Sequence, residues 1–235
     1  MSRLFFDLLI LAGILLLLKI AVYSLFFKSE IRATLERDPA ATGVLSVILS
    51  YPGIHALFYY RVSHVLYKLQ LHFFARLVSQ IGRWLTGIEI HPGAKIGAGF
   101  FIDHGMGVVI GETAEIGKNV TLFQGVTLGG TGKHKGKRHP TLGDNVVVGA
   151  GAKVLGPIHI GDNVSVGANA VVIHDVPPNS TVVGVPGRVT RREGKKVEGI
   201  NMDHTSLPDP LSQALQKLQQ EIDKIERELK DKYSK

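Results

Sequence analysis

The chain has 235 residues, a net charge of +7, 27 glycines and no cysteine. Its hydrophobic content of 45% and mean hydropathy of +0.16 exclude a disordered chain. The lack of cysteine excludes a disulfide scaffold, an iron–sulfur cluster, a thiolate metal site and a cysteine nucleophile.

The first element expected along the chain is an apolar helix within residues 1–30. Only Lys19 interrupts the uncharged segment 8–27, which is long enough to cross a bilayer. A lysine near the middle of such a span would be costly, and Arg3 and Lys28 flank the segment without a signal-peptide cleavage site. Two interpretations remain open: a membrane anchor on the cytoplasmic face, and a buried helix that forms an oligomer.

Residues 31–87 are expected to form an N-terminal helical region. Residues 43–86 are mostly aliphatic and aromatic, and Pro52-Gly53 predicts a break between helices. Asp38-Pro39 predicts a helix N-terminus, with the aspartate as N-cap and the proline as first helical residue.

A repeat of six residues dominates positions 88–190, where most of the glycines lie. Aliphatic residues recur at this spacing at Ile90, Ile96, Ile102, Ile110, Ile116, Leu122, Leu128, Leu142, Val148, Val154, Ile160, Val166 and Val172. A period of six fits neither an amphipathic helix nor an alternating strand. It predicts a solenoid in which each short strand and turn forms one side of a triangular coil. The expected fold is mainly β, a left-handed parallel β-helix with an N-terminal α-helical region and a C-terminal helix.

The period breaks twice, and insertions into a solenoid become loops on its face. Two extra residues between Ile102 and Ile110 bring in Asp103 and His104, and eight extra residues enter between 128 and 142. The second insertion holds a basic cluster made of Lys133, Lys135, Lys137 and Arg138. A compact basic loop suits one phosphorylated small molecule better than a nucleic acid, which needs a stripe of charge spanning many phosphates.

Residues 191–210 are polar and are expected to be a linker. In residues 211–235, apolar side chains step by four and three at Leu211, Leu215, Leu218, Ile222, Ile225 and Leu229. This heptad seam predicts a C-terminal helix that either forms a short coiled coil or packs on its own subunit.

His104 is the histidine best placed for chemistry, because at a break in the repeat it need not point into the core. An imidazole there can act as a general base near neutral pH, although a surface-loop histidine without a role would look the same. Glu89 lies 15 positions earlier, close to one 18-residue coil, so its carboxylate could orient the imidazole as the acid of a catalytic triad does.

Several motifs together resemble the serine O-acetyltransferases of the hexapeptide-repeat acyltransferase superfamily. The resemblance runs from about residue 38 to residue 187. The motifs are Glu89-Ile90-His91-Pro92, Ile102-Asp103-His104-Gly105, Val109-Ile110-Gly111-Glu112-Thr113, Val126-Thr127-Leu128-Gly129-Gly130-Thr131-Gly132-Lys133 and Arg138-His139-Pro140.

The resemblance implies transfer of an acetyl group from acetyl-CoA to the hydroxyl of L-serine, the first step of cysteine biosynthesis from serine. It implies that His104 is the catalytic base and Glu89 the acid that orients it, a position where many members have aspartate. Arg138 and His139 match the residues that hold the substrate carboxylate.

The resemblance also implies that Asp38 and Asp103 lie around the substrate ammonium group. Ala150 and Ala168 match small positions along which the pantetheine arm of acetyl-CoA lies, and Lys153 matches a CoA phosphate contact less closely. Acetyl-CoA is expected as co-substrate, with no metal and no tightly bound cofactor.

A cytoplasmic homotrimer inhibited by cysteine is implied as well, whereas the short N-terminal region leaves a hexamer open. In the family, the O-acetylserine sulfhydrylase partner usually recognises a C-terminal isoleucine; this chain ends in Lys235, which argues against that complex.

Three other functions compete with this assignment. The chain could be another hexapeptide O-acetyltransferase acting on a sugar or an antibiotic. It could be a zinc-dependent carbonic anhydrase with His91, His104 and His139 as ligands, although their spacing does not support it. It could also be a membrane-linked scaffold without catalysis, which would leave the basic loop unexplained.

Overall fold

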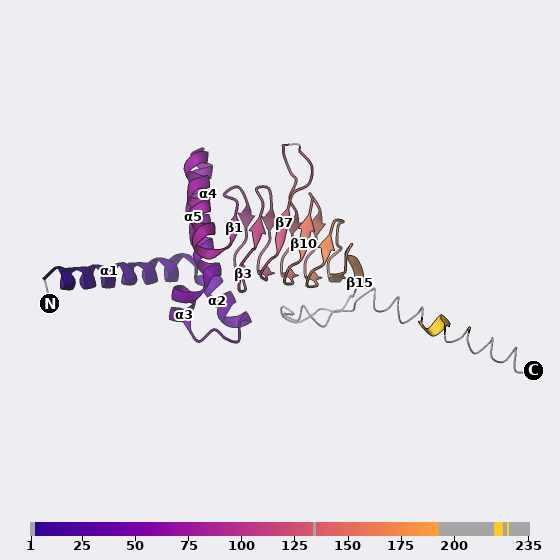
Figure 1. The fold of residues 1–235 in the computed structure, drawn as a ribbon, viewed down its shortest axis with the longest axis horizontal. Helices are drawn as coiled ribbons and strands as arrows, with labels where there is room; N and C mark the ends of the chain where they lie inside the picture. Colours follow the sequence, from indigo (N-terminus) through magenta and orange to yellow (C-terminus); the bar gives the residue numbers. More distant parts are fainter. Residues whose placement is uncertain (1–2, 134, 193–218, 223–224, 226–235) are drawn as a thin grey trace, which may run out of the picture.

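The computed structural model describes residues 3–133, 135–192, 219–222 and 225. In this part of the chain, a helical region is followed by a solenoid of short parallel strands (Figure 1). Most of the expected linker 191–210 lies outside the described residues, and residues 191–192 belong to the last strand. The expected C-terminal helix 211–235 is described only at 219–222 and 225, which are helical.

The N-terminal region contains the predicted helices and the predicted break between them. The helices are α1 (Arg3–Phe26), α2 (Lys28–Arg37), α3 (Val44–Ser50), α4 (Pro52–Lys68) and α5 (His72–Thr86). Pro52 is the first residue of α4, where its missing N–H costs nothing. The preceding helix ends at Ser50 with Tyr51 as its C-cap, so the break that Pro52-Gly53 predicted is present.

The prediction that Asp38 begins a helix is wrong, because Asp38 is the C-cap of α2. Its backbone N–H donates to the carbonyl of Thr34 at 2.9 Å. Pro39 disfavours a helical conformation at the residue before it, so the helix ends here. The Asp38 carboxylate accepts the backbone N–H of Ala40 at 2.8 Å and closes a turn.

Three sheets form the sides of the solenoid. The strands are β1 (Glu89–Ile90), β2 (Lys95–Ile96), β3 (Phe101–Ile102), β4 (Val109–Ile110), β5 (Glu115–Ile116), β6 (Thr121–Leu122), β7 (Thr127–Gly129), β8 (Thr141–Leu142), β9 (Val147–Val148), β10 (Lys153–Leu155), β11 (His159–Ile160), β12 (Ser165–Val166), β13 (Val171–Val172), β14 (Ser180–Val183) and β15 (Arg188–Arg192). The first sheet has the order β1-β4-β7-β10-β13, the second β2-β5-β8-β11, and the third β3-β6-β9-β12-β14-β15. Through the coils each strand pairs in parallel with the third strand after it, except that β12 pairs with β14, and β15 joins antiparallel at the end.

The period of six is confirmed by the strand register. The predicted aliphatic residues pair as three columns: Ile90, Ile110, Leu128, Val154 and Val172; Ile96, Ile116, Leu142 and Ile160; Ile102, Leu122, Val148 and Val166. Almost all of them are buried, so the columns form the continuous core of the solenoid.

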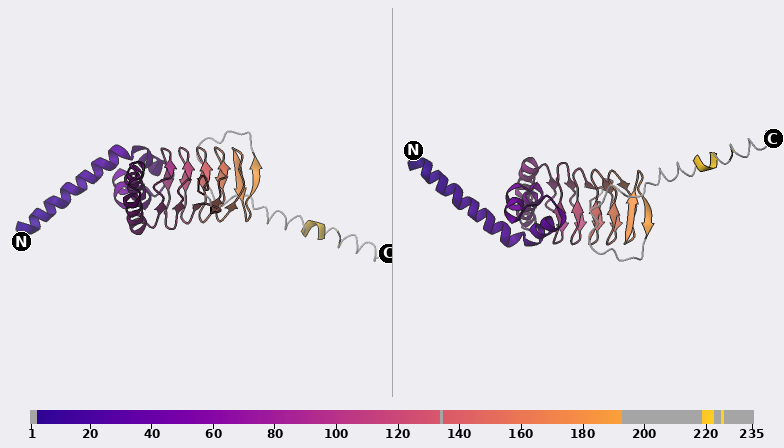
Figure 2. Two further views of the ribbon diagram at one scale, coloured as in Figure 1. Left: turned by 90° about the horizontal axis from the view of Figure 1, so that it is seen from above. Right: turned by 90° about the horizontal axis from the view of Figure 1, so that it is seen from below.

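The helical region covers the first coil of the solenoid. The Ser79 hydroxyl on α5 donates to the carbonyl of Ile90 at 2.8 Å. A Cβ on Gly53 of α4 would lie only 2.6 Å from the carbonyl oxygen of Ile102, which explains the glycine at this close approach. α1 projects away from this end of the molecule (Figure 2).

Candidate active site

His104 lies in the turn between β3 and β4 and faces solvent. Its side chain is 75% exposed, and its Nε2 is 3.9 Å from the Asp103 carboxylate. Its φ of 56° is left-handed, a conformation that the other non-glycine residues of the solenoid adopt only at turn asparagines such as Asn119 and Asn145. A histidine held in this sparsely populated conformation at an exposed turn is a candidate functional residue.

Acidic side chains gather beside this turn. The hydroxyl of Tyr51 donates to Asp38 Oδ2 at 2.6 Å. Burial raises the pKa of Tyr51 to about 12, with further contributions from this hydrogen bond and from the negative charges of Asp38 and Asp103. The structure thus brings together Asp38, Asp103 and His104, and adds Tyr51, which was not singled out from the sequence.

Glu89 lies one coil below the His104 turn, as its position in the sequence suggested. Its backbone N–H donates to the carbonyl of Val108, directly after that turn. The carboxylate is ion-paired with Arg83 at 3.3 Å. Since the arginine side chain is 56% exposed, this pair adds at most about 1 kcal/mol and can exchange partners.

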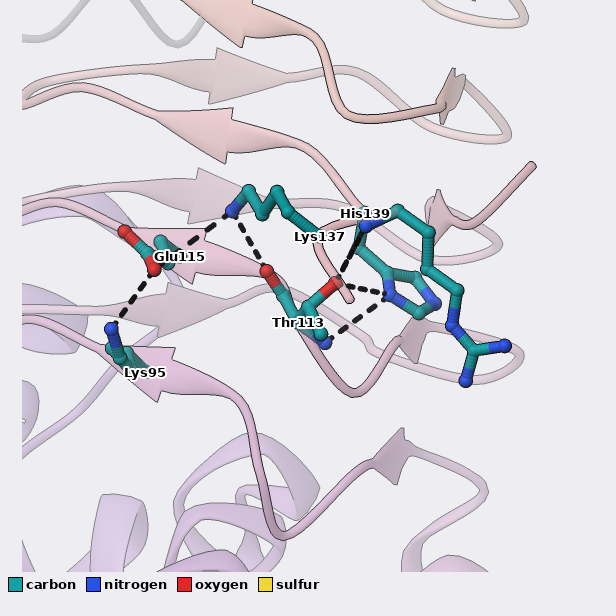
Figure 3. A network of polar contacts seen from close by, with 6 residues as sticks. Lys95, Thr113, Glu115, Lys137 and His139 are labelled. Atoms are coloured by element: carbon teal, nitrogen blue, oxygen red, sulfur yellow. Dashed lines mark hydrogen bonds and ion pairs between the residues drawn. The ribbon is translucent and has the colours of Figure 1, made fainter. Parts of the chain in front are cut away.

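His139 is held in one orientation by Thr113 (Figure 3). The ring is 8% exposed, and its Nδ1 accepts the backbone N–H of Thr113 at 3.2 Å. The Thr113 hydroxyl lies 2.9 Å from the same nitrogen and accepts the backbone N–H groups of Arg138 and His139 at 3.0 and 3.1 Å. Because Nδ1 is an acceptor, the ring proton resides on Nε2, which is left as a donor.

Gly111 makes room for this ring. A Cβ at this position would lie 1.9 Å from Cδ2 of His139, an impossible separation. The glycine in the Gly111-Glu112-Thr113 motif is therefore required by the placement of a site residue and not only by the turn.

Arg138 is oriented by Glu112. Its Nη2 donates to Glu112 Oε2 at 2.8 Å, and the hydroxyl of Tyr67 donates to Glu112 Oε1 at 3.3 Å. Burial tends to raise the pKa of Glu112, but the hydrogen bond from Arg138 and nearby positive charge hold it below its usual value. The carboxylate thus stays ionised and fixes the guanidinium.

Two histidines at this turn are kept neutral. Burial, followed by the charge of Arg76, lowers the pKa of His91 to about 4. Burial and the charge of Arg138 likewise lower the pKa of His139. A neutral His139 agrees with the hydrogen bonds that its Nδ1 accepts.

The inserted basic loop is tied to the solenoid by a polar network (Figure 3). Lys137 Nζ donates to the carbonyl of Thr113 at 2.8 Å and lies 4.0 Å from Glu115, which is paired with Lys95 at 2.9 Å. These contacts place Arg138 and His139 at the end of the loop.

The proposed acetyl-CoA positions line one corner of the solenoid, above the His104 turn. Backbone N–H groups link successive turns: Gly125 donates to Met106, Gly151 to Gln124, and Asn169 to Ala150, at 2.8 to 2.9 Å. Ala150 and Ala168 thus lie at the same corner as the turn that holds His104, with the turn of Gln124 in between. Lys153 begins the strand after Ala150, and its Nζ donates to the carbonyl of Gly125.

The predicted site residues fall into two groups within one chain. His104 lies in the turn from the third sheet to the first, whereas Arg138 and His139 lie in the turn from the first sheet to the second. His91 shares the second turn, so the three histidines considered as zinc ligands do not converge. Within the described ranges, no group of three or more His, Asp or Glu side chains could hold a metal ion.

An exposed histidine at a corner of a solenoid built from repeats of six residues fits an acyltransferase of the hexapeptide-repeat class. Residues 139–174 match the family described as bacterial transferase hexapeptide (six repeats). The chain is 56% identical to the serine acetyltransferase of Bacillus subtilis over 205 residues, which are 87% of this chain and 94% of that protein.

Two solved structures extend the comparison. The serine acetyltransferase of Neisseria gonorrhoeae in complex with serine superposes with a TM-score of 0.68 at 41% identity, over 72% of this chain and 69% of that chain. A serine acetyltransferase in complex with cysteine has a TM-score of 0.68 at 42% identity, over 69% of this chain and 68% of that chain. The chain belongs to the serine acetyltransferase family.

Proposed function

We propose that this chain transfers the acetyl group of acetyl-CoA to the hydroxyl of L-serine, yielding O-acetyl-L-serine and CoA, with His104 as general base. The observation that carries the proposal is the exposed, left-handed His104 at the same corner of the solenoid as the small residues Ala150 and Ala168. Its acidic neighbours Asp38 and Asp103 suit the ammonium group of an amino acid.

In the proposed reaction, His104 accepts the serine hydroxyl proton as the oxygen attacks the thioester carbonyl. The tetrahedral intermediate then collapses, the carbon–sulfur bond breaks, and the imidazolium returns the proton to the departing CoA thiolate. Glu89 stabilises the imidazolium after exchanging Arg83 for His104, which the weak exposed ion pair permits. Arg138 and the Nε2–H of His139 bind the serine carboxylate.

We infer that each complete site forms between two subunits of a homotrimer. His104 and Arg138 lie in different turns of one triangular coil, so a neighbouring solenoid is needed to bring the two groups onto one substrate. The winding is left-handed in this proposal, as the hexapeptide repeat implies.

The pantetheine arm of acetyl-CoA lies along the corner formed by Ala150 and Ala168, where larger side chains would block it. Lys153 and the exposed lysines of the inserted loop supply positive charge for the phosphates. Neither a metal nor a tightly bound cofactor enters this chemistry.

Cysteine is proposed as a feedback inhibitor that occupies the serine site, supported by the cysteine complex of a relative. The proposed location is cytoplasmic, with the α1 helix in contact with the membrane.

Mixed trimers test the intersubunit site. His104→Ala and Arg138→Ala variants should each lose acetyl transfer to L-serine, measured as CoA release. Coexpressed in equal amounts, they should recover about a quarter of wild-type activity, since that fraction of interfaces pairs an intact His104 with an intact Arg138. If the mixture stays as inactive as its components, the two groups do not act across subunits.

A further inference from the structure

One face of α5 exposes a continuous row of large apolar side chains. We call it the α5 outer face. It consists of Phe73 (74% exposed), Phe74 (55%), Leu77 (48%), Ile81 (43%), Trp84 (83%) and Leu85 (52%). The opposite face packs inward through Ala75, Ser79, Gly82 and Thr86. Exposed apolar residues at helical spacing are typical of a surface that meets another apolar phase.

The neighbouring helix α1 is also apolar and uncovered. Its segment Phe5–Phe26 has a mean hydropathy of 2.5, and its most apolar window has no buried residues. Lys19 does not interrupt the free part, because its Nζ lies 3.3 Å from Nε2 of His55 and packs over the ring of Tyr23 at the base of the helix.

The free part of α1 therefore ends near residue 18. From residue 5, it measures about 21 Å at 1.5 Å per residue. This length passes the midplane of a hydrocarbon core of about 30 Å but does not cross it.

α1 and the α5 outer face form one continuous apolar surface. A groove of about 560 Å³ links them and is lined by α1, α4 and α5, with the apolar side chains Leu15, Leu18, Val22, Phe58 and Leu85 among its walls. Both helices lie at the end of the solenoid opposite its last coil, and α1 points away from the strands (Figure 2).

The charge around this surface favours an anionic bilayer over another protein surface of the same kind. Residues 39–88 contain no Asp or Glu but carry Arg61, Lys68, Arg76 and Arg83. Arg61 and Arg83 are paired with glutamates outside this segment. Arg76 lies near His91 with its Nη1 buried, which leaves Lys68 as the exposed positive charge of the segment. Two copies pressed together through this segment would bring like charges together, whereas anionic headgroups would neutralise them.

We propose that α1 and the α5 outer face together form a membrane-binding surface for an anionic lipid bilayer. α1 enters the acyl chains, and α5 lies in the membrane plane with Trp84 at the headgroup boundary, where tryptophan is favoured. The apolar side chains of this surface take no part in the acetyl-transfer site, so failure of this proposal would leave the proposed reaction untouched.

Trp84 provides a direct probe because it is the only tryptophan of the chain. The full-length protein is reconstituted in vesicles of phosphatidylcholine and phosphatidylglycerol, in which a share of the lipid carries bromine at shallow or at deep acyl positions. Shallow bromines should reduce Trp84 emission by roughly twofold, and deep bromines should reduce it less, as expected for a ring at the interface.

A matched control moves the probe to the far end of the solenoid. The Trp84→Phe, Ile173→Trp double variant places the tryptophan at an exposed position after β13, the last strand of the first sheet. Its emission should not respond to brominated lipid, and CoA release should match that of the wild type.

Two results would overturn the proposal. One is equal quenching of the wild type and the control variant, or no quenching of either, in vesicles that retain the protein. The other is found without lipid: if an aqueous quencher reaches Trp84 less and less as the protein concentration rises, a second copy covers the α5 outer face.

Discussion

Replacing Thr113 with valine tests how the residues proposed to bind the substrate carboxylate, Arg138 and His139, are held in place. Valine keeps the shape of threonine but removes the hydroxyl that accepts the backbone N–H groups of Arg138 and His139. The backbone N–H of residue 113 still donates to Nδ1 of His139, so the tautomer survives, whereas the loop loses its support and Nδ1 loses its contact with the hydroxyl.

The size of the effect follows from these two hydrogen bonds. Each hydrogen bond contributes about 1 kcal/mol in a partly buried setting, so the ordered conformation of the loop loses about 2 kcal/mol of stabilisation. If serine binding must restore that order, the KM for L-serine rises roughly 10- to 30-fold. The KM for acetyl-CoA should stay within about twofold of the wild-type value, because the corner proposed to bind acetyl-CoA, with Ala150 and Ala168, is a different turn of the coil.

Steady-state CoA release with L-serine and acetyl-CoA varied separately measures both constants. Thr113→Ser is the matched control, since it retains the hydroxyl and should remain close to the wild type. The reasoning is refuted if Thr113→Val leaves the KM for serine unchanged, or if the serine variant is impaired as severely as the valine variant.

Three further predictions concern other parts of the molecule. His104→Ala should lower kcat roughly 100- to 10,000-fold with an unchanged circular-dichroism spectrum; near wild-type turnover would remove His104 as the base. Ala168→Leu should raise the KM for acetyl-CoA at least about tenfold without affecting that for serine, whereas Lys118→Leu, in another turn, should change neither. The pKa of His91 is about 4 in the folded chain and 6.5 in the unfolded chain. As the pH falls from 6.5 to 4, the unfolded chain therefore binds the proton first, and the free energy of unfolding decreases. Between pH 7 and pH 5, urea unfolding of His91→Asn should therefore show a smaller loss of stability than the wild type, by about 1 kcal/mol after discounting for partial exposure; identical losses would contradict the assignment.

The solenoid could be predicted from the sequence because its signal is local and periodic. Each aliphatic residue at the period of six occupies the column that the spacing assigned to it, and both insertions are turns that carry site residues. Counting the aliphatic residues in threes places Ile102 in the third column and Leu128 in the first, so the same repeat already implies that His104 and Arg138 belong to different turns.

The supporting residues of the site could not be predicted in the same way. Thr113 and Glu112 contact residues 25 and 26 positions away, and nothing in their own neighbourhood marks those contacts. Asp38 was placed at the wrong end of a helix because the pattern Asp-Pro fits a helix start, whereas here the proline ends α2. The partner of Glu89 was missed because Arg83 lies on a helix whose orientation against β1 is set by packing.

Acceptor selectivity in CoA release tests the central claim most directly. The purified full-length chain is given acetyl-CoA with L-serine, homoserine or simple sugars, and free thiol is followed over time. Rapid thiol release with L-serine, together with formation of O-acetylserine, is the predicted result. Release with a sugar but not with L-serine would contradict the assignment and favour another hexapeptide O-acetyltransferase.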